Sequence, residues 1–248
     1  MGLFSKFFGK PEPLHPIDPG FLINDVHSHF IPGIDDGAQT LEDSLDMLEA
    51  FQEMGYKKVI TTPHVMSDHY RNTPEIILGG LETVKQAAQE KGLTIEVQAA
   101  AEYYLDHDLE SLVEEKKVLT FGDNYILFEL PFISEPAILD PIIFVMQTNG
   151  YRPVLAHPAR YSFWHDNYER YKQLYEKGVI LQINIGSIIG AYGPSVKRTA
   201  EKLIDDGMVR LVGSDCHNMS HVPMIQAAFQ EPYFHKLIDQ GVLLNAEL

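Results

Sequence analysis

The chain of 248 residues has a single cysteine, Cys216, so it cannot form a disulfide within itself. It also lacks any apolar run near the roughly 20 residues that a membrane-spanning helix needs. Its first 20 residues, MGLFSKFFGKPEPLHPIDPG, contain neither a long apolar core nor a small-residue cleavage site. We therefore expect a cytoplasmic protein with no stable membrane insertion. Residues 1–20 are expected to form a tail and linker, and residues 21–248 a single domain.

Positive charge is scarce. Lysine and arginine total 19 against 35 aspartates and glutamates, which gives a formal net charge of −16. Such a field repels polyanions, so nucleic acid is a poor candidate for the main partner. The hydrophobic share of 45% is that of an ordinary globular protein, and the length suits one α/β domain. The composition leaves the oligomeric state open.

Apolar strand patterns alternate with helix patterns along the chain. Strands are expected at 22–27, 58–62, 94–100, 125–130, 152–157, 179–185 and 208–214. Helices are expected from Thr40 to Gly55, from Thr73 to Gly92 and from Pro194 to Gly207, and over about 106–115, 136–149 and 166–177. Strict alternation predicts a parallel sheet, either open or closed into a barrel.

Six of the seven expected strands end in a residue that can ligate a metal. These residues are His27, His29, His64, Glu102, Glu129, His157, Asp215 and His217. The ends of parallel strands share one face of the sheet, so these side chains should converge there. A single buried histidine is usually an ordinary core residue. Eight buried imidazoles and carboxylates on one face would, however, be strongly destabilising unless paired or metal-bound.

The spacing of these residues points to a shared site. Residues two apart in a strand face the same side, so His27 and His29 form one pair, and Asp215 and His217 form another, with Cys216 facing away. Mixed imidazole and carboxylate ligands suit Mn²⁺, Fe²⁺ or Zn²⁺, and the absence of thiolates argues against a structural zinc site.

A pair of aspartates, Asp35 and Asp36, follows in the loop after the first strand. With one of them, the candidate ligands are too many for a single ion. The sequence therefore predicts two or three ions in one site.

Five motifs carry a resemblance to a known family: DVHSHFIPGIDDG, TTPH, FELP, AHPAR and SDCHN. Together they resemble the polymerase-and-histidinol-phosphatase (PHP) superfamily. Within it, they are most similar to the bacterial manganese-dependent protein tyrosine phosphatases of capsule and exopolysaccharide operons. The resemblance spans about residues 22–222. It implies a distorted seven-stranded (βα)7 barrel with a trinuclear metal site.

The resemblance also implies a role for each motif residue. One ion would be held by His27, His29, Glu102 and Asp215, a second by Glu102, Glu129 and His157, and a third by Asp36, His64 and His217. Arg160 would contact the phosphate. The family often has a second phosphate-binding arginine after its SDxHN motif, but this chain has NMSHVP there, which makes His221 a candidate substitute. His221 and Asp35 are also candidate proton donors.

The expected reaction is metal-assisted hydrolysis of a phosphomonoester. A cysteine phosphatase is excluded, because its nucleophile needs an arginine six positions on, where Cys216 has Val222. The resemblance implies that the substrate is the phosphotyrosine-bearing tail of a bacterial tyrosine kinase. Three alternatives stay open: a small-molecule enzyme such as histidinol phosphatase, a nuclease, and a metal-bound regulatory module without catalysis.

Overall fold

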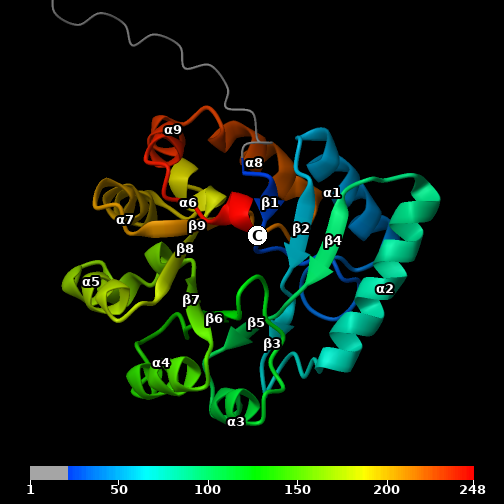
Figure 1. The fold of residues 1–248 in the computed structure, drawn as a ribbon. Helices are drawn as coiled ribbons and strands as arrows, with labels where there is room; N and C mark the ends of the chain where they lie inside the picture. Colours follow the sequence, from blue (N-terminus) through cyan, green and yellow to red (C-terminus); the bar gives the residue numbers. More distant parts are fainter. Residues whose placement is uncertain (1–21) are drawn as a thin grey trace, which may run out of the picture.

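The computed structural model describes residues 22–248, so the expected tail at 1–20 lies outside the described residues. The strands are β1 (Asn24–Asp25), β2 (Lys58–Thr61), β3 (His64–Val65), β4 (Glu96–Ala99), β5 (Glu102–Tyr104), β6 (Tyr125–Glu129), β7 (Arg152–Ala156), β8 (Ile180–Asn184) and β9 (Val209–Gly213). The α-helices are α1 (Leu41–Glu53), α2 (Pro74–Lys91), α3 (Asp108–Glu114), α4 (Leu139–Thr148), α5 (Glu169–Glu176), α6 (Ile185–Ile189), α7 (Pro194–Asp205), α8 (Val222–Ala228) and α9 (Pro232–Asp239). Figure 1 shows the helices around a ring of strands.

All the strand pairs are parallel, as the alternation predicted. The strands form two sheets, ordered β1-β2-β4 and β3-β5-β6-β7-β8-β9. A parallel bridge between Ser28 and Cys216 joins the ends of β1 and β9. The predicted α/β barrel is therefore confirmed, but residues 22–248 form nine strands where seven were expected. Pro63, which has no amide hydrogen for the ladder, separates β2 from β3, and a similar break separates β4 from β5.

Helix ends follow the expected capping chemistry. Thr40 and Asp43 form a capping box at the start of α1. Thr73 caps α2, and Gly92 ends it with a φ of 82°, a left-handed conformation that suits glycine. The short helix α6 was not expected, because it follows β8 directly without a loop.

None of the helices between residues 22 and 248 has the length and apolar composition needed to cross a membrane.

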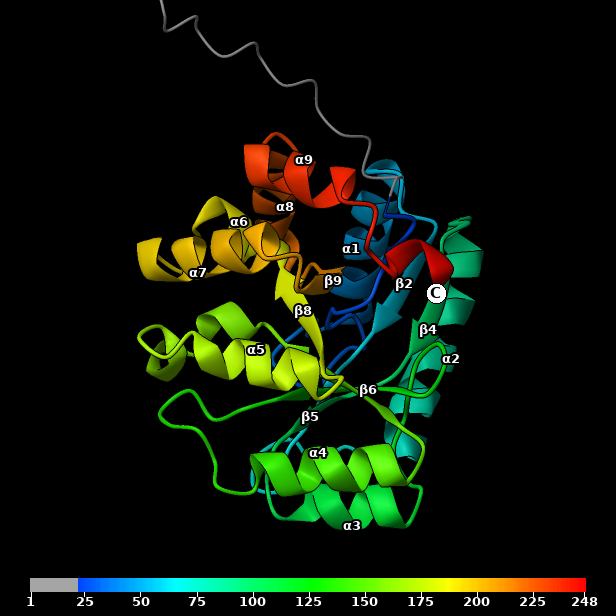
Figure 2. The ribbon, with the colours of Figure 1, turned by 60° about the vertical axis from the view of Figure 1, so that its left-hand side comes forward.

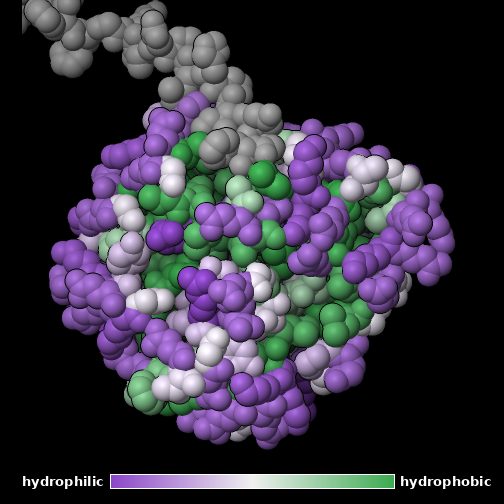
Figure 3. Space-filling model, viewed as in Figure 1, coloured by the Kyte–Doolittle hydropathy of each residue, from purple (hydrophilic) through white to green (hydrophobic). Residues whose placement is uncertain are grey.

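Inside the ring of strands, alternating side chains lead from an apolar layer to a polar one. Tyr125 and Leu127 of β6 belong to a small buried cluster, and Glu129 is the next residue on the same side of the strand. A larger apolar cluster fills the space between strands and helices, which Figure 2 shows packed against the outside of the ring. Figure 3, on the face where the C-terminus lies, shows mostly hydrophilic side chains around the rim. The strands thus deliver buried polar groups to their carboxyl ends.

Candidate metal centre

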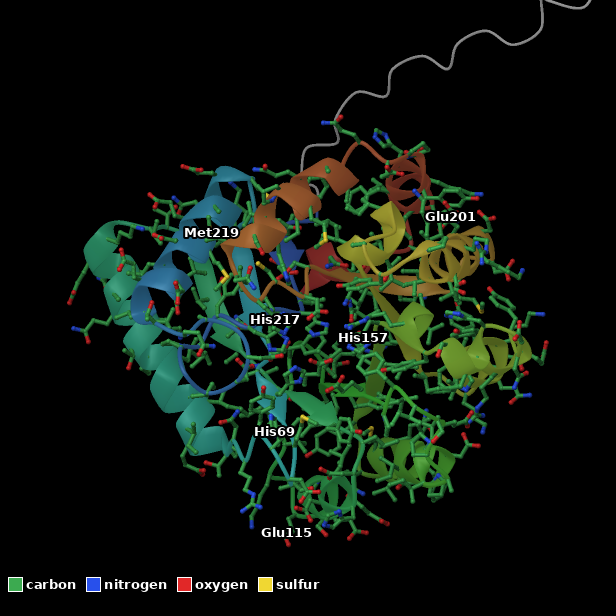
Figure 4. All side chains as sticks on the ribbon, turned by 180° about the vertical axis from the view of Figure 1, so that it is seen from behind. His69, Glu115, His157, Glu201, His217 and Met219 are labelled. Atoms are coloured by element: carbon green, nitrogen blue, oxygen red, sulfur yellow. The ribbon has the colours of Figure 1, made fainter. Side chains whose placement is uncertain are left out.

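The nine residues predicted as ligands meet at the carboxyl ends of the strands. Seven of them line a cleft of about 510 Å³: Asp36, His64, Glu102, Glu129, His157, Asp215 and His217. His27 and His29 lie beneath it, fully buried. Figure 4 shows His157 and His217 near the middle of the barrel, in a view from behind that of Figure 1. Their role as metal ligands stays a prediction, but the structure brings all nine together.

Glu102 lies at the centre of the cluster. Its Oε2 is 3.1 Å from Nε2 of His27 and 3.2 Å from Nδ1 of His64, and its Oε1 is 3.1 Å from Nε2 of His157. A fourth imidazole nitrogen, Nε2 of His29, lies 3.6 Å from Oε2. The carboxylate is fully buried. Because its two oxygens face different histidines, Glu102 has the geometry of a bridging ligand.

Three overlapping groups of side chains place their ligand atoms within 4.8 Å of one another. They are His29, Asp36, His64 and His217; then His27, His29 and Asp215; and finally His64, Glu102 and Glu129. The first two agree closely with two of the implied ligand sets, with His29 common to both. The third group pairs Glu102 and Glu129 with His64, whereas the resemblance implies that His157 is the histidine that joins these two glutamates. Nε2 of His157 nevertheless lies 3.6 Å from Oε2 of Glu129.

Two buried imidazole nitrogens lack hydrogen-bond partners and indicate whether the site could accept metal ions. Nε2 of His29 and Nδ1 of His64 are buried and make no hydrogen bond. Yet carboxylate oxygens lie nearby, at 3.5 Å on Asp215 for the first and 3.2 Å on Glu102 for the second. Unpartnered buried polar atoms are costly, and a shared cation would satisfy both nitrogens and oxygens. The donor set of imidazoles and carboxylates therefore fits divalent ions such as Mn²⁺, Fe²⁺ or Zn²⁺.

The charges of the cluster depend on one another. Burial favours the neutral imidazole, but the carboxylates of Glu102 and Asp215 outweigh it and raise the pKa of His27 to about 9. Burial also favours the neutral acid, yet the imidazoles of His27 and His64 hold the pKa of Glu102 well below its usual range. The ionisation of these side chains is therefore linked. A metal ion that bound here would displace the imidazole protons.

Asp35 lies behind the histidines and does not line the cleft. Its Oδ2 is 2.7 Å from Nδ1 of His29 and accepts a hydrogen bond from the backbone N–H of His64. Its Oδ1 accepts one from Gly37, and interaction with His29 lowers the pKa of this carboxyl although burial opposes it. The sequence makes Asp35 a candidate proton donor. A buried, ionised carboxylate with both oxygens occupied is also suited to orienting His29.

Two amides of the sixth expected strand complete the polar layer; the sequence places Asn184 at the end of this strand but predicts no role for either amide. Oε1 of Gln182 lies 3.0 Å from Nδ1 of His27, so Nε2 of that ring is directed toward Glu102. Asn184 donates to Oδ2 of Asp215 at 2.5 Å and accepts from Gln182. Gln182 and Asn184 are two positions apart, so both side chains lie on the same side of β8. Polar residues at alternate positions of the otherwise apolar VILQINI segment were the available signal.

The backbone is unusual at two candidate ligands. His157 has a φ of 37° and Asp215 a φ of 52°, in the left-handed region that non-glycine residues seldom adopt. Gly213, just before Ser214, allows close packing beside the site, because a Cβ there would lie 2.5 Å from Cβ of His27. Strained conformations of this kind gather at functional sites, where the surrounding structure enforces them.

Arg160 and His221 both reach the cleft. Nη1 of Arg160 lies 3.3 Å from Oδ2 of Asp215, so its guanidinium stands beside the candidate ligands. His221 is half-buried, and burial together with His217 lowers its pKa. A lowered pKa favours the neutral imidazole, which can still donate a hydrogen bond.

Cys216 is fully buried, and its Sγ lies 3.8 Å from Sδ of Met47. Burial raises the pKa of its thiol well above the ordinary value. A protonated thiol in the apolar core is unreactive, in agreement with the sequence, which excluded a cysteine phosphatase.

Aromatic residues surround the mouth of the cleft. Phe132, which follows β6, lines it with Tyr70 and Tyr192. Tyr161 and Trp164, which follow β7, are buried in the core. Tyr70 and Tyr192 lie in segments outside the motifs, so nothing in their sequence context predicted a place at the site.

A parallel barrel with a polynuclear metal site at the carboxyl ends of its strands is the architecture of metal-dependent hydrolases. The family described as capsular polysaccharide synthesis, CpsB/CapC, matches residues 23–240, and the chain belongs to this family. Tyrosine-protein phosphatase YwqE from Bacillus subtilis is 30% identical over 196 residues, covering 79% of this chain and 77% of YwqE. Tyrosine-protein phosphatase CpsB from Streptococcus pneumoniae is 26% identical over 212 residues, covering 83% of this chain and 87% of CpsB.

Solved structures agree with the family assignment. A crystal structure from a study of YwqE from Bacillus subtilis and CpsB from Streptococcus pneumoniae, described as unique metal-dependent tyrosine phosphatases, superposes with a TM-score of 0.78 at 27% identity. The superposition covers 90% of the present chain and 94% of the chain in that crystal structure. A lactonase from Listeria monocytogenes, at 13% identity and a TM-score of 0.51, shares the fold alone.

Proposed function

We propose that this protein is a metal-dependent tyrosine-protein phosphatase acting in capsule or exopolysaccharide synthesis. The observation that carries the proposal is the single cleft in which three overlapping ligand groups meet beside the guanidinium of Arg160. The names of the relatives, which are tyrosine-protein phosphatases, support this activity over that of a histidinol phosphatase. The net charge of −16 weighs against a nuclease.

The residues proposed to hold the ions are His27, His29, Asp36, His64, Glu102, Glu129, His157, Asp215 and His217. Two or three ions suit this number of ligands, and Mn²⁺ suits their mixed chemistry. When bound, such ions activate water for hydrolysis and neutralise the charge of the phosphate. Asp35 and Gln182 orient two of the histidines, so the cluster is held in place by its surroundings.

Arg160 is proposed to bind the phosphate. A guanidinium presents five N–H donors in a plane that matches phosphate oxygens. Tyr70, Phe132 and Tyr192 line the same cleft and offer apolar walls to the ring of a phosphotyrosine. The leaving phenol has a pKa of about 10, so it needs less protonation than an alkyl alcohol would. An aryl ester would therefore depend less on a proton donor such as His221 or Asp35.

The proposed partner is the phosphotyrosine-bearing tail of a bacterial tyrosine kinase in the cytoplasm. An extended tail can insert a phosphorylated side chain into a cleft at a strand-end surface, whereas a folded domain would be hindered by the surrounding loops.

Steady-state assays at fixed Mn²⁺ test the proposal. A phosphotyrosine peptide should have a higher kcat/KM than the matched phosphoserine peptide or histidinol phosphate. Arg160→Ala should lower kcat/KM for the phosphotyrosine peptide by about two orders of magnitude, the scale of one lost transition-state contact. Arg198→Ala, which changes an exposed arginine of α7, is the control and should have no effect. Equal or better kcat/KM on histidinol phosphate would refute the proposed substrate.

A further inference from the structure

The guanidinium of Arg160 lies within cation–π distance of two aromatic rings. Its Cζ is 4.7 Å from the centroid of Phe132 and 4.5 Å from that of Tyr192. The three residues come from different parts of the chain. Phe132 follows β6, Arg160 ends the 3₁₀ turn Pro158–Arg160, and Tyr192 follows α6. Tertiary structure alone creates this arrangement.

Each ring is itself held by neighbours. Phe132 stacks on His157, with centroids 5.7 Å apart and an interplanar angle of 19°. The hydroxyl of Tyr192 lies 3.5 Å from Nδ2 of Asn184. Gly186 leaves room for the Tyr192 ring, because a Cβ there would lie 3.1 Å from Cε2 of that ring. The two rings are therefore fixed relative to the candidate ligands and not only to the arginine.

The arginine keeps most of its donors available. Among residues 22–248, its one side-chain hydrogen bond joins Nη1 to Oδ2 of Asp215. That carboxylate also lies 3.5 Å from both His27 and His29 and accepts from Asn184, so it is shared among several groups. A single shared bond does not fix the plane of a flexible side chain. Cation–π contacts with two rings restrict the orientation of the guanidinium without occupying any N–H group.

We propose that Phe132 and Tyr192 are positioning residues that hold Arg160 in the orientation that binds phosphate. The inference rests on the proposed function, in which Arg160 contacts the phosphate of the substrate. The rings act through the arginine, so their effect should extend to every phosphomonoester the enzyme hydrolyses and should not require an aromatic ester.

Leucine replacements remove one ring at a time. Phe132→Leu and Tyr192→Leu should each lower kcat/KM on the order of tenfold, and should raise the inhibition constant of inorganic phosphate by a similar factor. The loss should appear with an alkyl phosphomonoester, which has no ring for these side chains to contact, as well as with p-nitrophenyl phosphate. Tyr192→Phe keeps the ring and should stay within about twofold of wild type. Phe144→Leu, at an exposed aromatic of α4, is the matched control.

A double-mutant cycle isolates the mechanism. In an Arg160→Ala background, the leucine replacements should cause almost no further loss, because the residue they position is gone. Metal content and thermal denaturation confirm that each variant is folded and loaded. The proposal is overturned by additive losses in the cycle, by an unchanged phosphate inhibition constant, by a failure of Tyr192→Phe to restore activity, or by a loss confined to aryl esters. If phosphotyrosine is a poor substrate, the cycle with p-nitrophenyl phosphate still decides this inference separately.

Discussion

Replacing Glu102 by glutamine would remove a negative charge from the middle of four histidines. Oε2 of Glu102 faces His27 and His64 at 3.1 and 3.2 Å, and Oε1 faces His157 at 3.1 Å. Glutamine keeps the shape but turns one of these oxygens into an NH₂ group, which cannot ligate a cation. Only one side of the former bridge would retain a ligand atom.

The expected loss follows from this geometry. A carboxylate with both oxygens directed at ligand groups should hold two ions, so Glu102→Gln should lose at least one of the two or three ions. With the ligand array incomplete, kcat should fall on the order of 10³-fold, or about 4 kcal/mol of transition-state stabilisation. This is larger than the loss expected for Arg160→Ala, because Glu102 acts on the whole cluster.

Two measurements on the purified variant are needed. Metal content per chain is measured after dialysis, and kcat is measured with a saturating phosphotyrosine peptide at fixed Mn²⁺. Glu53→Gln, at an exposed glutamate that ends α1, is the matched control and should keep wild-type values. Thermal denaturation separates metal loss from unfolding. A folded Glu102→Gln protein with wild-type stoichiometry and rate would refute the bridging role.

Three further changes give contrasting outcomes. Cys216→Ser should leave kcat within a few-fold of wild type, since the buried thiol is not a nucleophile; an inactive but fully metallated variant would contradict this. Asp35→Asn should weaken metal affinity 10- to 100-fold in a competition titration, because it loosens the hold on His29. If Asp35 were instead a proton donor, the variant would keep its metal affinity and lose one limb of the pH–rate profile. Asn245→Ala removes three buried hydrogen bonds that link Asn245 to β1 and β9. It should lower the free energy of unfolding by about 2 kcal/mol in a urea titration. An unchanged urea midpoint would show that these bonds contribute nothing to stability.

The sequence predicted the convergence of the candidate ligands because that convergence follows from general rules. Parallel strands end on one face, and alternate residues share a side, so His27, His29 and Asp215 could be brought together without knowing any loop. The caps at Thr40 and Thr73 were similarly local, since each depends on side chains within three residues. The family resemblance supplied the implied ligand sets, which no spacing rule gives.

Other features depend on tertiary packing. Asp35 and Asp36 are adjacent in one loop, and only the fold shows that the first orients His29 while the second is half-exposed at the cleft. Gln182 is one amide in an apolar strand, and its contact with His27 joins residues 155 positions apart. Tyr192 reaches Arg160 from a turn after an unexpected helix.

The most direct test of the account is an activity titration of chelated protein. The protein is stripped with excess chelator and dialysed, and its turnover of a phosphotyrosine peptide is followed as metal is added in known equivalents. We predict no turnover at the start, and a return of activity that levels off at two or three Mn²⁺ per chain. Mg²⁺ should restore less, because it prefers oxygen ligands and water to imidazole. Full turnover by protein shown to contain no metal would contradict the central claim.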